Sequence, residues 1–174
     1  AIWQNLFELF EDEAKKKNIV FHYKVDVEHK HILTDVTKIE EIFVNIMSNA
    51  MKYTLSGGSV MVNVEELPCD ESGYIIVRTR VSDTGIGMSQ EFVQKIFSPF
   101  ERERTSTVSR TQGTGLGMAI TKNIVDMMGG TIEVQTEQGK GTEFIVRLPL
   151  RIQSKHHRVE KIAELEGLKA LVID

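Results

Sequence analysis

Cysteine is nearly absent from this sequence of 174 residues, which contains a single one, Cys69. One thiol cannot form a disulfide within the chain, and Cys69 has no partner ligand with which to hold zinc. A reducing, cytosolic setting is therefore expected.

Long apolar runs and an excess of positive charge are also lacking. No apolar run approaches the roughly 20 residues of a membrane-spanning helix. The first residues carry several acidic side chains and do not resemble a secretory signal peptide. The formal net charge of −4 and the pI near 5.8 predict no nucleic-acid partner, because such binding needs a basic face.

The residues that are present suit one soluble globular domain. Hydrophobic residues make up 41% of the chain and charged residues 26%, and the length allows a full core. We expect a domain over residues 1–150, a polar linker over 151–167 and a short apolar strand over 168–174. Both ends look cut, so a longer parent protein is expected.

Hydrophobic periodicity predicts a mixture of helices and strands. Helical spacing of apolar residues predicts helices over 2–17, from Thr34 or Asp35 to about 53, from Ser89 to Pro99, and from the glycines at 113–118 to Gly129. Alternating or β-branched segments predict strands at 19–25, 60–64, 74–82, 131–136 and 141–150, with 31–33 as a candidate short addition.

The strand at 74–82 leads into Asp83-Thr84-Gly85-Ile86-Gly87-Met88. An ionised Asp only accepts hydrogen bonds, so it suits a ligand that offers an N–H, such as the exocyclic amine of adenine. The two glycines allow a sharp turn and the close approach of a flat ligand. A plain turn in which Asp83 caps its own loop is the alternative.

The helix that ends near residue 53 carries a polar stripe beside its apolar face: Glu41, Asn45, Asn49 and Lys52. Asn is unfavourable inside a helix because its amide competes for backbone hydrogen bonds. Two amide oxygens in one line suit a hard cation, and the ammonium a turn later suits a phosphate. A solvated face is the alternative.

Residues 101–112 contain one apolar side chain, Val108, and three arginines. A segment that cannot bury much surface inside a compact domain predicts a lid or a binding loop, with a disordered insertion as the alternative. The glycines of residues 113–118 follow and open a helix. The exposed N–H groups of such a helix start favour an anion.

Two common glycine-rich motifs do not match. A dinucleotide-binding G-x-G-x-x-G would need a third glycine, or a final Ala, where Met118 or Ile120 stands. A P-loop needs G-x-x-x-x-G-K-[ST], which Gly139-Lys140-Gly141-Thr142 does not provide.

Four short motifs occur in one order along the chain: Asn45-x-x-x-Asn49-Ala50-x-Lys52-Tyr53, Asp83-x-Gly85-x-Gly87, Phe97-x-x-Phe100 and Gly113-x-Gly115-x-Gly117. Their combination resembles the N, G1, F and G2 boxes of the ATP-binding catalytic domain of sensor histidine kinases. The resemblance covers about residues 1–150. It implies an α/β two-layer sandwich with a mixed five-stranded sheet and three main helices on one face.

The resemblance also implies roles for individual residues. Asp83 would bind the adenine amine, Asn45 and Asn49 would hold Mg²⁺ and the phosphates, Arg102 would be a lid arginine, and Thr142 would complete the adenine pocket through a water. The implied ATP-binding residues are Asn45, Asn49, Lys52, Tyr53, Asp83, Gly85, Ile86, Gly87, Met88, Phe100, Arg102, Gly113, Thr114, Gly115, Leu116, Gly117, Met118 and Thr142.

One position separates kinases from ATPases within this resemblance. Gyrase, MutL proteins and heat-shock chaperones carry a Glu one turn before the Asn-Ala pair, and that Glu activates water. Asn45 stands there in this sequence. Phosphoryl transfer to an imidazole depends mainly on positioning and charge neutralisation, so a kinase is the first hypothesis. A nucleotide-sensing docking module without transfer and an ATPase that uses Glu41 are the alternatives.

None of the five histidines lies in the Ser/Thr-His-Glu context of a phosphoacceptor. The acceptor helices are therefore expected upstream, in a parent that is a homodimer. The terminal Leu171-Val172-Ile173-Asp174 resembles the first strand of a receiver domain, although a generic buried strand fits equally well. The expected partners are these helices and a receiver domain or response regulator.

Overall fold

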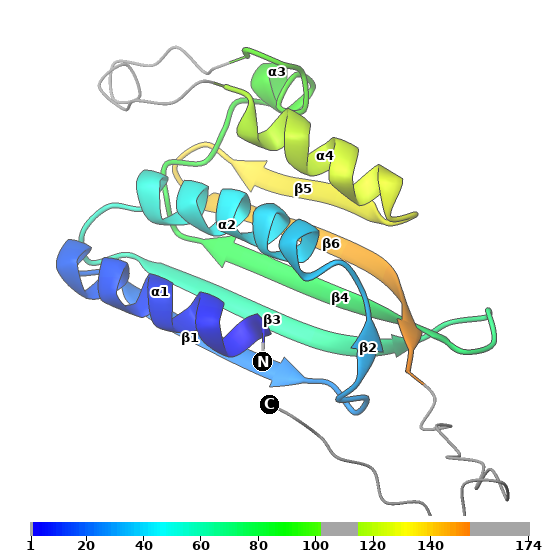
Figure 1. The fold of residues 1–174 in the computed structure, drawn as a ribbon. Helices are drawn as coiled ribbons and strands as arrows, with labels where there is room; N and C mark the ends of the chain where they lie inside the picture. The colour runs from blue at the N-terminus through cyan, green and yellow to red at the C-terminus, as the bar shows by residue number, and fades with distance from the viewer. Residues whose placement is uncertain (1, 102–114, 154–174) are drawn as a thin grey trace, which may run out of the picture.

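The computed structural model describes residues 2–101 and 115–153, which form a sheet covered on one face by helices (Figure 1). The helices are α1 (Ile2–Lys17), α2 (Val36–Tyr53), α3 (Gln90–Val93) and α4 (Gly117–Met127). The strands are β1 (Val20–Asp26), β2 (Ile32–Leu33), β3 (Ser59–Pro68), β4 (Tyr74–Asp83), β5 (Thr131–Glu137) and β6 (Gly141–Ile152). The predicted two-layer α/β sandwich is confirmed.

The sheet is mixed, with the order β1-β3-β4-β6-β2 and with β5 also paired to β6. Only β1 and β3 run parallel among the strand pairs that the structure describes. The described sheet has six strands where five were predicted, because β2 pairs with the end of β6. A strand of two residues is too short for alternation to reveal it.

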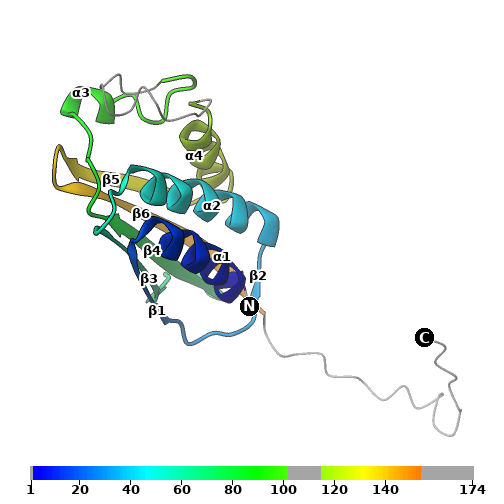
Figure 2. The same cartoon turned by 90° about the vertical axis from the view of Figure 1, so that its left-hand side faces the viewer.

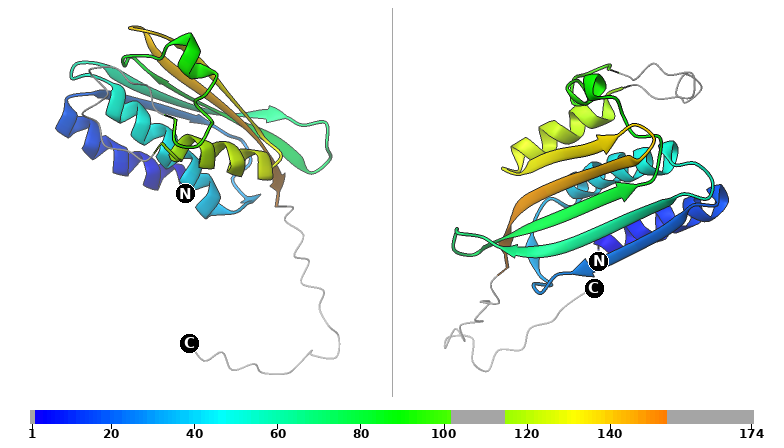
Figure 3. Two further views of the ribbon diagram at one scale, coloured as in Figure 1. Left: turned by 90° about the horizontal axis from the view of Figure 1, so that it is seen from above. Right: turned by 180° about the vertical axis from the view of Figure 1, so that it is seen from behind.

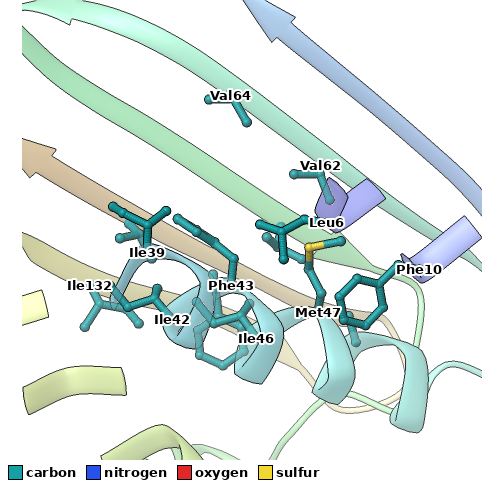
Figure 4. Close-up of a cluster of buried hydrophobic side chains, with 14 of the residues drawn as sticks. Leu6, Phe10, Ile39, Ile42, Phe43, Ile46, Met47, Val62, Val64 and Ile132 are labelled. Atoms are coloured by element: carbon teal, nitrogen blue, oxygen red, sulfur yellow. The ribbon is translucent and has the colours of Figure 1, made fainter. Parts of the chain in front are cut away.

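The core lies between the sheet and the helices α1, α2 and α4, which cover the same face (Figures 2 and 3). Val60, Val62 and Val64 of β3 point toward α2 because alternate residues of a strand share a face. Figure 4 shows the opposing side chains of α2, all of them buried: Ile39, Ile42, Phe43, Ile46 and Met47.

The face of the sheet away from the helices is polar and carries cross-strand pairs. Glu65 of β3 accepts from Arg78 of β4 at 2.9 Å, and Glu133 of β5 accepts from Arg147 of β6 at 2.6 Å. Ser82 donates to Glu143 at 2.6 Å. Among the described residues only one face of the sheet has a helix layer to pack against, which explains why the strands alternate apolar and polar residues.

Two helix boundaries depend on local hydrogen bonds. Asp35, not Thr34, caps α2, and its Oδ1 accepts from the N–H of Lys38 at 3.2 Å. The predicted helix from Ser89 to Pro99 is shorter than expected, because α3 ends at Val93. Beyond it the backbone continues with hydrogen bonds between residues three apart, such as Ser98 N to Lys95 O at 2.8 Å. Pro99 has no N–H to donate to the carbonyl of Lys95, four residues earlier, so that carbonyl cannot receive the bond of a continuing helix.

The last predicted strand, 141–150, extends two residues further than the pattern indicated. β6 continues through Ile152, and the N–H of Gln153 donates to the carbonyl of His31 at 3.0 Å. The rest of the predicted linker and the predicted strand at 168–174 lie outside the described residues. Within residues 2–101 and 115–153, no helix combines the length and the apolar character that a lipid bilayer requires of a spanning helix.

Candidate nucleotide site

Segments that are far apart in sequence meet at one end of the sheet, at the left of Figure 1: the last turns of α2, the end of β4, the start of β6 and the start of α4. They enclose about 730 Å³ of space, part of it open to solvent. The described lining residues are Asn49, Ala50, Tyr53, Asp83, Ile86, Gly87, Met88, Phe92, Ile96, Gly115, Met118, Thr142 and Phe144.

Asp83 is the one carboxylate among the described lining residues. Its Oδ1 accepts the N–H of Gly85 at 2.8 Å, and the backbone N–H of Thr142 also donates to the carboxylate. Burial raises the pKa of Asp83 from 3.8 to about 6, while the two N–H donors work in the opposite direction. Above about pH 6 the side chain is therefore a fixed acceptor.

The loop after Asp83 is held between the end of α2 and the β5–β6 turn. The N–H of Ile86 donates to the carbonyl of Tyr53 at 3.2 Å, and its carbonyl accepts from Gly139 at 2.7 Å. Gly87 has a φ of 63°, and a Cβ there would lie 2.0 Å from the carbonyl oxygen of Glu137. The glycine thus permits close backbone packing, and its predicted second role in making room for a base stays a prediction.

The two asparagines of α2 have different surroundings. Asn49 lines the cavity. Asn45 does not line its described part; its Nδ2 donates to the carbonyl of Gly117 and to the hydroxyl of Thr121, both at 3.3 Å. Asn45 therefore ties α2 to the start of α4. Because its Nδ2 is committed to these acceptors, its Oδ1 is the atom left for a cation.

The start of α4 suits an anion. Leu116 is the N-cap residue and has no hydrogen-bonding side chain, so no N-cap side chain competes for the first N–H groups of the helix. Gly115 and Met118 line the cavity beside this helix start. The predicted cradle for phosphates at the start of this helix is compatible with that geometry.

The structure brings together half of the predicted site residues. Those that line the cavity are Asn49, Tyr53, Asp83, Ile86, Gly87, Met88, Gly115, Met118 and Thr142. Six predicted and described residues are not among its lining residues: Asn45, Lys52, Gly85, Phe100, Leu116 and Gly117. Arg102, Gly113, Thr114 and the predicted lid beyond Glu101 lie outside the described residues.

Two of the residues away from the lining still have informative contacts. Phe100 is 75% exposed, and its backbone N–H donates to the carbonyl of Gly115 at 3.0 Å, so it reaches the site through the main chain. The ammonium of Lys52 lies 5.2 Å from the centroid of the Tyr53 ring. This places Lys52 over a ring that lines the cavity.

Four lining residues were not predicted as site residues: Ala50, Phe92, Ile96 and Phe144. The sequence shows Ala50, Phe92 and Ile96 as apolar positions of helical faces and Phe144 as part of a strand. Periodicity does not distinguish a side chain that fills the core from one that lines a cavity next to it. The one signal was the position of Ala50, directly after Asn49 in the first motif.

Comparison with known proteins shows the family. Residues 34–152 match the family described as histidine kinase-, DNA gyrase B-, and HSP90-like ATPases. The chain belongs to this family. Within it, this ATPase domain is 34% identical over 172 residues to the autoinducer 2 sensor kinase/phosphatase LuxQ of Vibrio parahaemolyticus. The matched region covers 93% of this chain and 20% of LuxQ. The domain thus spans about a fifth of the length of that curated relative.

Solved structures indicate the histidine kinase branch of the family. Full-length ShkA in complex with AMPPNP is similar with a TM-score of 0.71 and 29% identity, over 88% of this chain and 30% of ShkA. The nucleotide-free catalytic domain of histidine kinase ThkA gives a TM-score of 0.66 and 29% identity, over 85% of this chain and 91% of that one. ThkA has also been solved in complex with the response regulator TrrA, with a TM-score of 0.62 and 26% identity, over 85% of this chain and 39% of that one. The domain is a histidine kinase-type ATPase domain that binds ATP.

The raised pKa of Asp83 makes the stability of this ATPase domain depend on pH. Since the folded-state pKa lies above the unfolded value of 3.8, its stabilising contribution is full below about pH 4 and is lost as the pH rises through about 6. The variant Asp83→Asn has no charge to bury. Its free energy of unfolding, relative to wild type, should therefore rise by up to about 3 kcal/mol between pH 4 and pH 8.

Urea denaturation of the nucleotide-free domain at both pH values measures this difference. A difference between variant and wild type that stays constant from pH 4 to pH 8 would contradict the raised pKa.

Proposed function

We propose that this domain binds Mg-ATP with the adenine amine against Asp83 and supplies the γ-phosphate to a histidine on a helix of the parent protein outside this chain. The observation that carries the proposal is the position of Asp83. Its carboxylate is held by the N–H groups of Gly85 and Thr142 at one side of a cavity that also includes the start of α4. The base and the phosphates thus each have a matching surface.

The residues present fit a magnesium ion that is shared with phosphates. No group of three or more His, Cys, Asp or Glu that could hold a metal occurs within residues 2–101 and 115–153. The amide oxygens of Asn45 and Asn49 are hard ligands, and a cation held by so few protein groups needs phosphate oxygens and water as well. When bound, the ion supplies charge neutralisation for the transferring phosphoryl group.

Transfer to histidine fits the site better than hydrolysis does. An imidazole nitrogen would attack the γ-phosphorus, the bond to the β–γ bridging oxygen would break, and ADP would leave. Asn45 cannot act as a base for water, since an amide does not accept a proton at neutral pH and its Nδ2 is bonded to α4. Glu41 is exposed and does not line the described cavity, which leaves Asp83 as its one described carboxylate.

Partners and location follow from the same proposal. The acceptor helices and a receiver domain or response regulator are the partners, in a homodimeric parent whose ATPase domain faces the ATP of the cytoplasm. The complex of ThkA with TrrA supports a response regulator as one of these partners.

Reconstitution with the parent's upstream helices tests the proposal. The chain alone should bind ATP but form no stable phosphohistidine, whereas adding the separately produced helices with γ-labelled ATP should label their histidine. Labelling should be lost when Asp83→Asn replaces the wild-type chain. Binding without labelling would favour a docking module, and steady release of phosphate that is lost in Glu41→Ala would favour an ATPase.

A further inference from the structure

A hydroxyl group behind the cavity, that of Thr136 in β5, belongs to the same row of side chains as Asp83. Thr136 is paired with Thr142 across β5 and β6, and Thr142 is paired with Asp83 across β6 and β4. Residues directly opposite each other in a sheet project to the same face. Thr142 and Asp83 line the cavity, whereas Thr136 is outside its described lining.

The hydrogen-bonding capacity of the Thr136 hydroxyl is fully used. It donates to the carbonyl of Gly141 at 2.8 Å, accepts the N–H of Met88 at 3.0 Å and lies 3.0 Å from the hydroxyl oxygen of Thr142. A hydroxyl has one proton and two lone pairs. Because a carbonyl can only accept, the proton of Thr136 points to Gly141, and Thr142 must donate in the contact between the two hydroxyls.

This proton count decides what Thr142 can offer a ligand. Its proton is directed to Thr136, so its oxygen can only accept hydrogen bonds from the cavity side. We propose that Thr136 orients the Thr142 hydroxyl so that Thr142 and Asp83 together present only acceptors, and that this orientation makes the site select a 6-amino purine over a 6-oxo purine. The inference rests on the proposed function, which places a purine base against Asp83.

The chemistry of the two purine classes explains the expected selectivity. The amino group of adenine carries two N–H donors, which suit the carboxylate of Asp83 and, directly or through a water, the oxygen of Thr142. The oxygen at position 6 of inosine is itself an acceptor and would face the lone pairs of Asp83. Inosine also differs at N1, where it carries a proton and adenine has an acceptor. A freely rotating Thr142 hydroxyl could relieve this by donating to that oxygen, so the restraint from Thr136 is what keeps the 6-oxo nucleotide out.

Binding to the wild-type chain provides a first test that needs no variant. Affinities for ATP, purine riboside triphosphate and ITP, measured by calorimetry at pH 8, should decrease in that order. Purine riboside triphosphate has only a hydrogen at position 6 and, like ATP, no proton on N1, so it measures the loss of the amine alone; ITP adds both the oxygen and a proton on N1. Tighter binding of ITP than of purine riboside triphosphate would overturn the proposal.

Substitution of Thr136 tests its part in the selectivity. In Thr136→Val the Thr142 hydroxyl can turn toward the ligand, so the ratio of ATP to ITP affinity should fall about tenfold, the value of one hydrogen bond. Thr136→Ser keeps a hydroxyl and should restore the wild-type ratio. In a Thr142→Val background, where there is no hydroxyl to orient, Thr136→Val should leave the ratio unchanged.

The alternative outcomes are distinct. An equal loss of affinity for ATP and ITP in Thr136→Val would mean that Thr136 only holds the loop through Met88, and would overturn the orienting role. If wild-type ATP binding did not depend on Asp83, the proposed function itself would fail. A strong dependence on Asp83 with a ratio that is insensitive to Thr136 would reject this inference alone.

Discussion

Replacing Asp83 by asparagine is expected to weaken ATP binding about 100-fold or more at pH 8. The carboxylate has two oxygens for the N–H of Gly85, the N–H of Thr142 and the ligand amine. An amide has one carbonyl oxygen, and its NH₂ group would face another donor. Loss of a hydrogen bond to a charged acceptor together with an unmatched donor costs about 3 kcal/mol or more, which corresponds to this factor.

Calorimetric titration with ATP measures the effect, and Asp70→Asn is the matched control. Asp70 lies in the exposed loop between β3 and β4, at the other end of β4 from Asp83, so the same chemical change there should leave affinity unaltered. Because burial of the Asp83 charge is removed, the nucleotide-free Asp83→Asn domain should gain stability relative to wild type as the pH rises through about 6. Urea denaturation of the variant at pH 8 checks that unfolding does not account for the loss of affinity. Unchanged affinity in Asp83→Asn would remove the adenine assignment.

Replacing Gly141 by alanine is expected to lower the free energy of unfolding by about 3 kcal/mol or more. Gly141 has a φ of 109°, and a Cβ there would lie 1.9 Å from the carbonyl oxygen of Asp83. The Cβ is fixed by the backbone of residue 141 and the carbonyl oxygen belongs to the backbone of Asp83, so no side-chain rotation relieves the contact. β4 and β6 would have to separate where Asp83 pairs with Thr142, so ATP affinity should fall as well.

Gly139 in the same turn provides the control for this prediction. Its φ of 80° is also positive, but a Cβ there would meet nothing within 4 Å. Gly139→Ala should therefore cost only the backbone strain, about 1–2 kcal/mol. Denaturation followed by the fluorescence of Trp3, which packs against Phe43, compares the two variants. Equal losses would mean that the conformation of the glycine, and not its close packing against β4, sets the cost.

The helices and strands could be predicted because their signals are local. The predicted helix over residues 2–17 matches α1 in full, and the long strands β4 and β6 begin at the predicted residues. Shorter elements differ, since β2 has two residues and α3 four. Four residues contain little more than one helical turn, and there hydrogen bonds and Pro99 outweigh the apolar spacing.

Two of the lining residues could be predicted from residue type alone, and others, such as Met88 and Thr142, only through the family resemblance. Asp83 at the end of a β-branched strand and Asn49 inside a helix stand out from any pattern that serves packing alone. Phe144 and Ile96 do not, because an apolar side chain that lines a cavity has the same periodicity as one in the core. The tie between Asn45 and the start of α4 also had no local signal, since Gly117 and Thr121 are more than 70 residues away in sequence.

By itself the sequence determined the order of the elements, the position of the acidic side chain at the end of β4 and the glycines around it, because these depend on neighbours along the chain. Only the tertiary structure decided which of them share a cavity, how burial raises the pKa of Asp83 and where the proton of Thr142 points. Those properties arise from strands β4, β5 and β6 lying side by side, and no local pattern encodes the hydrogen bonds between them.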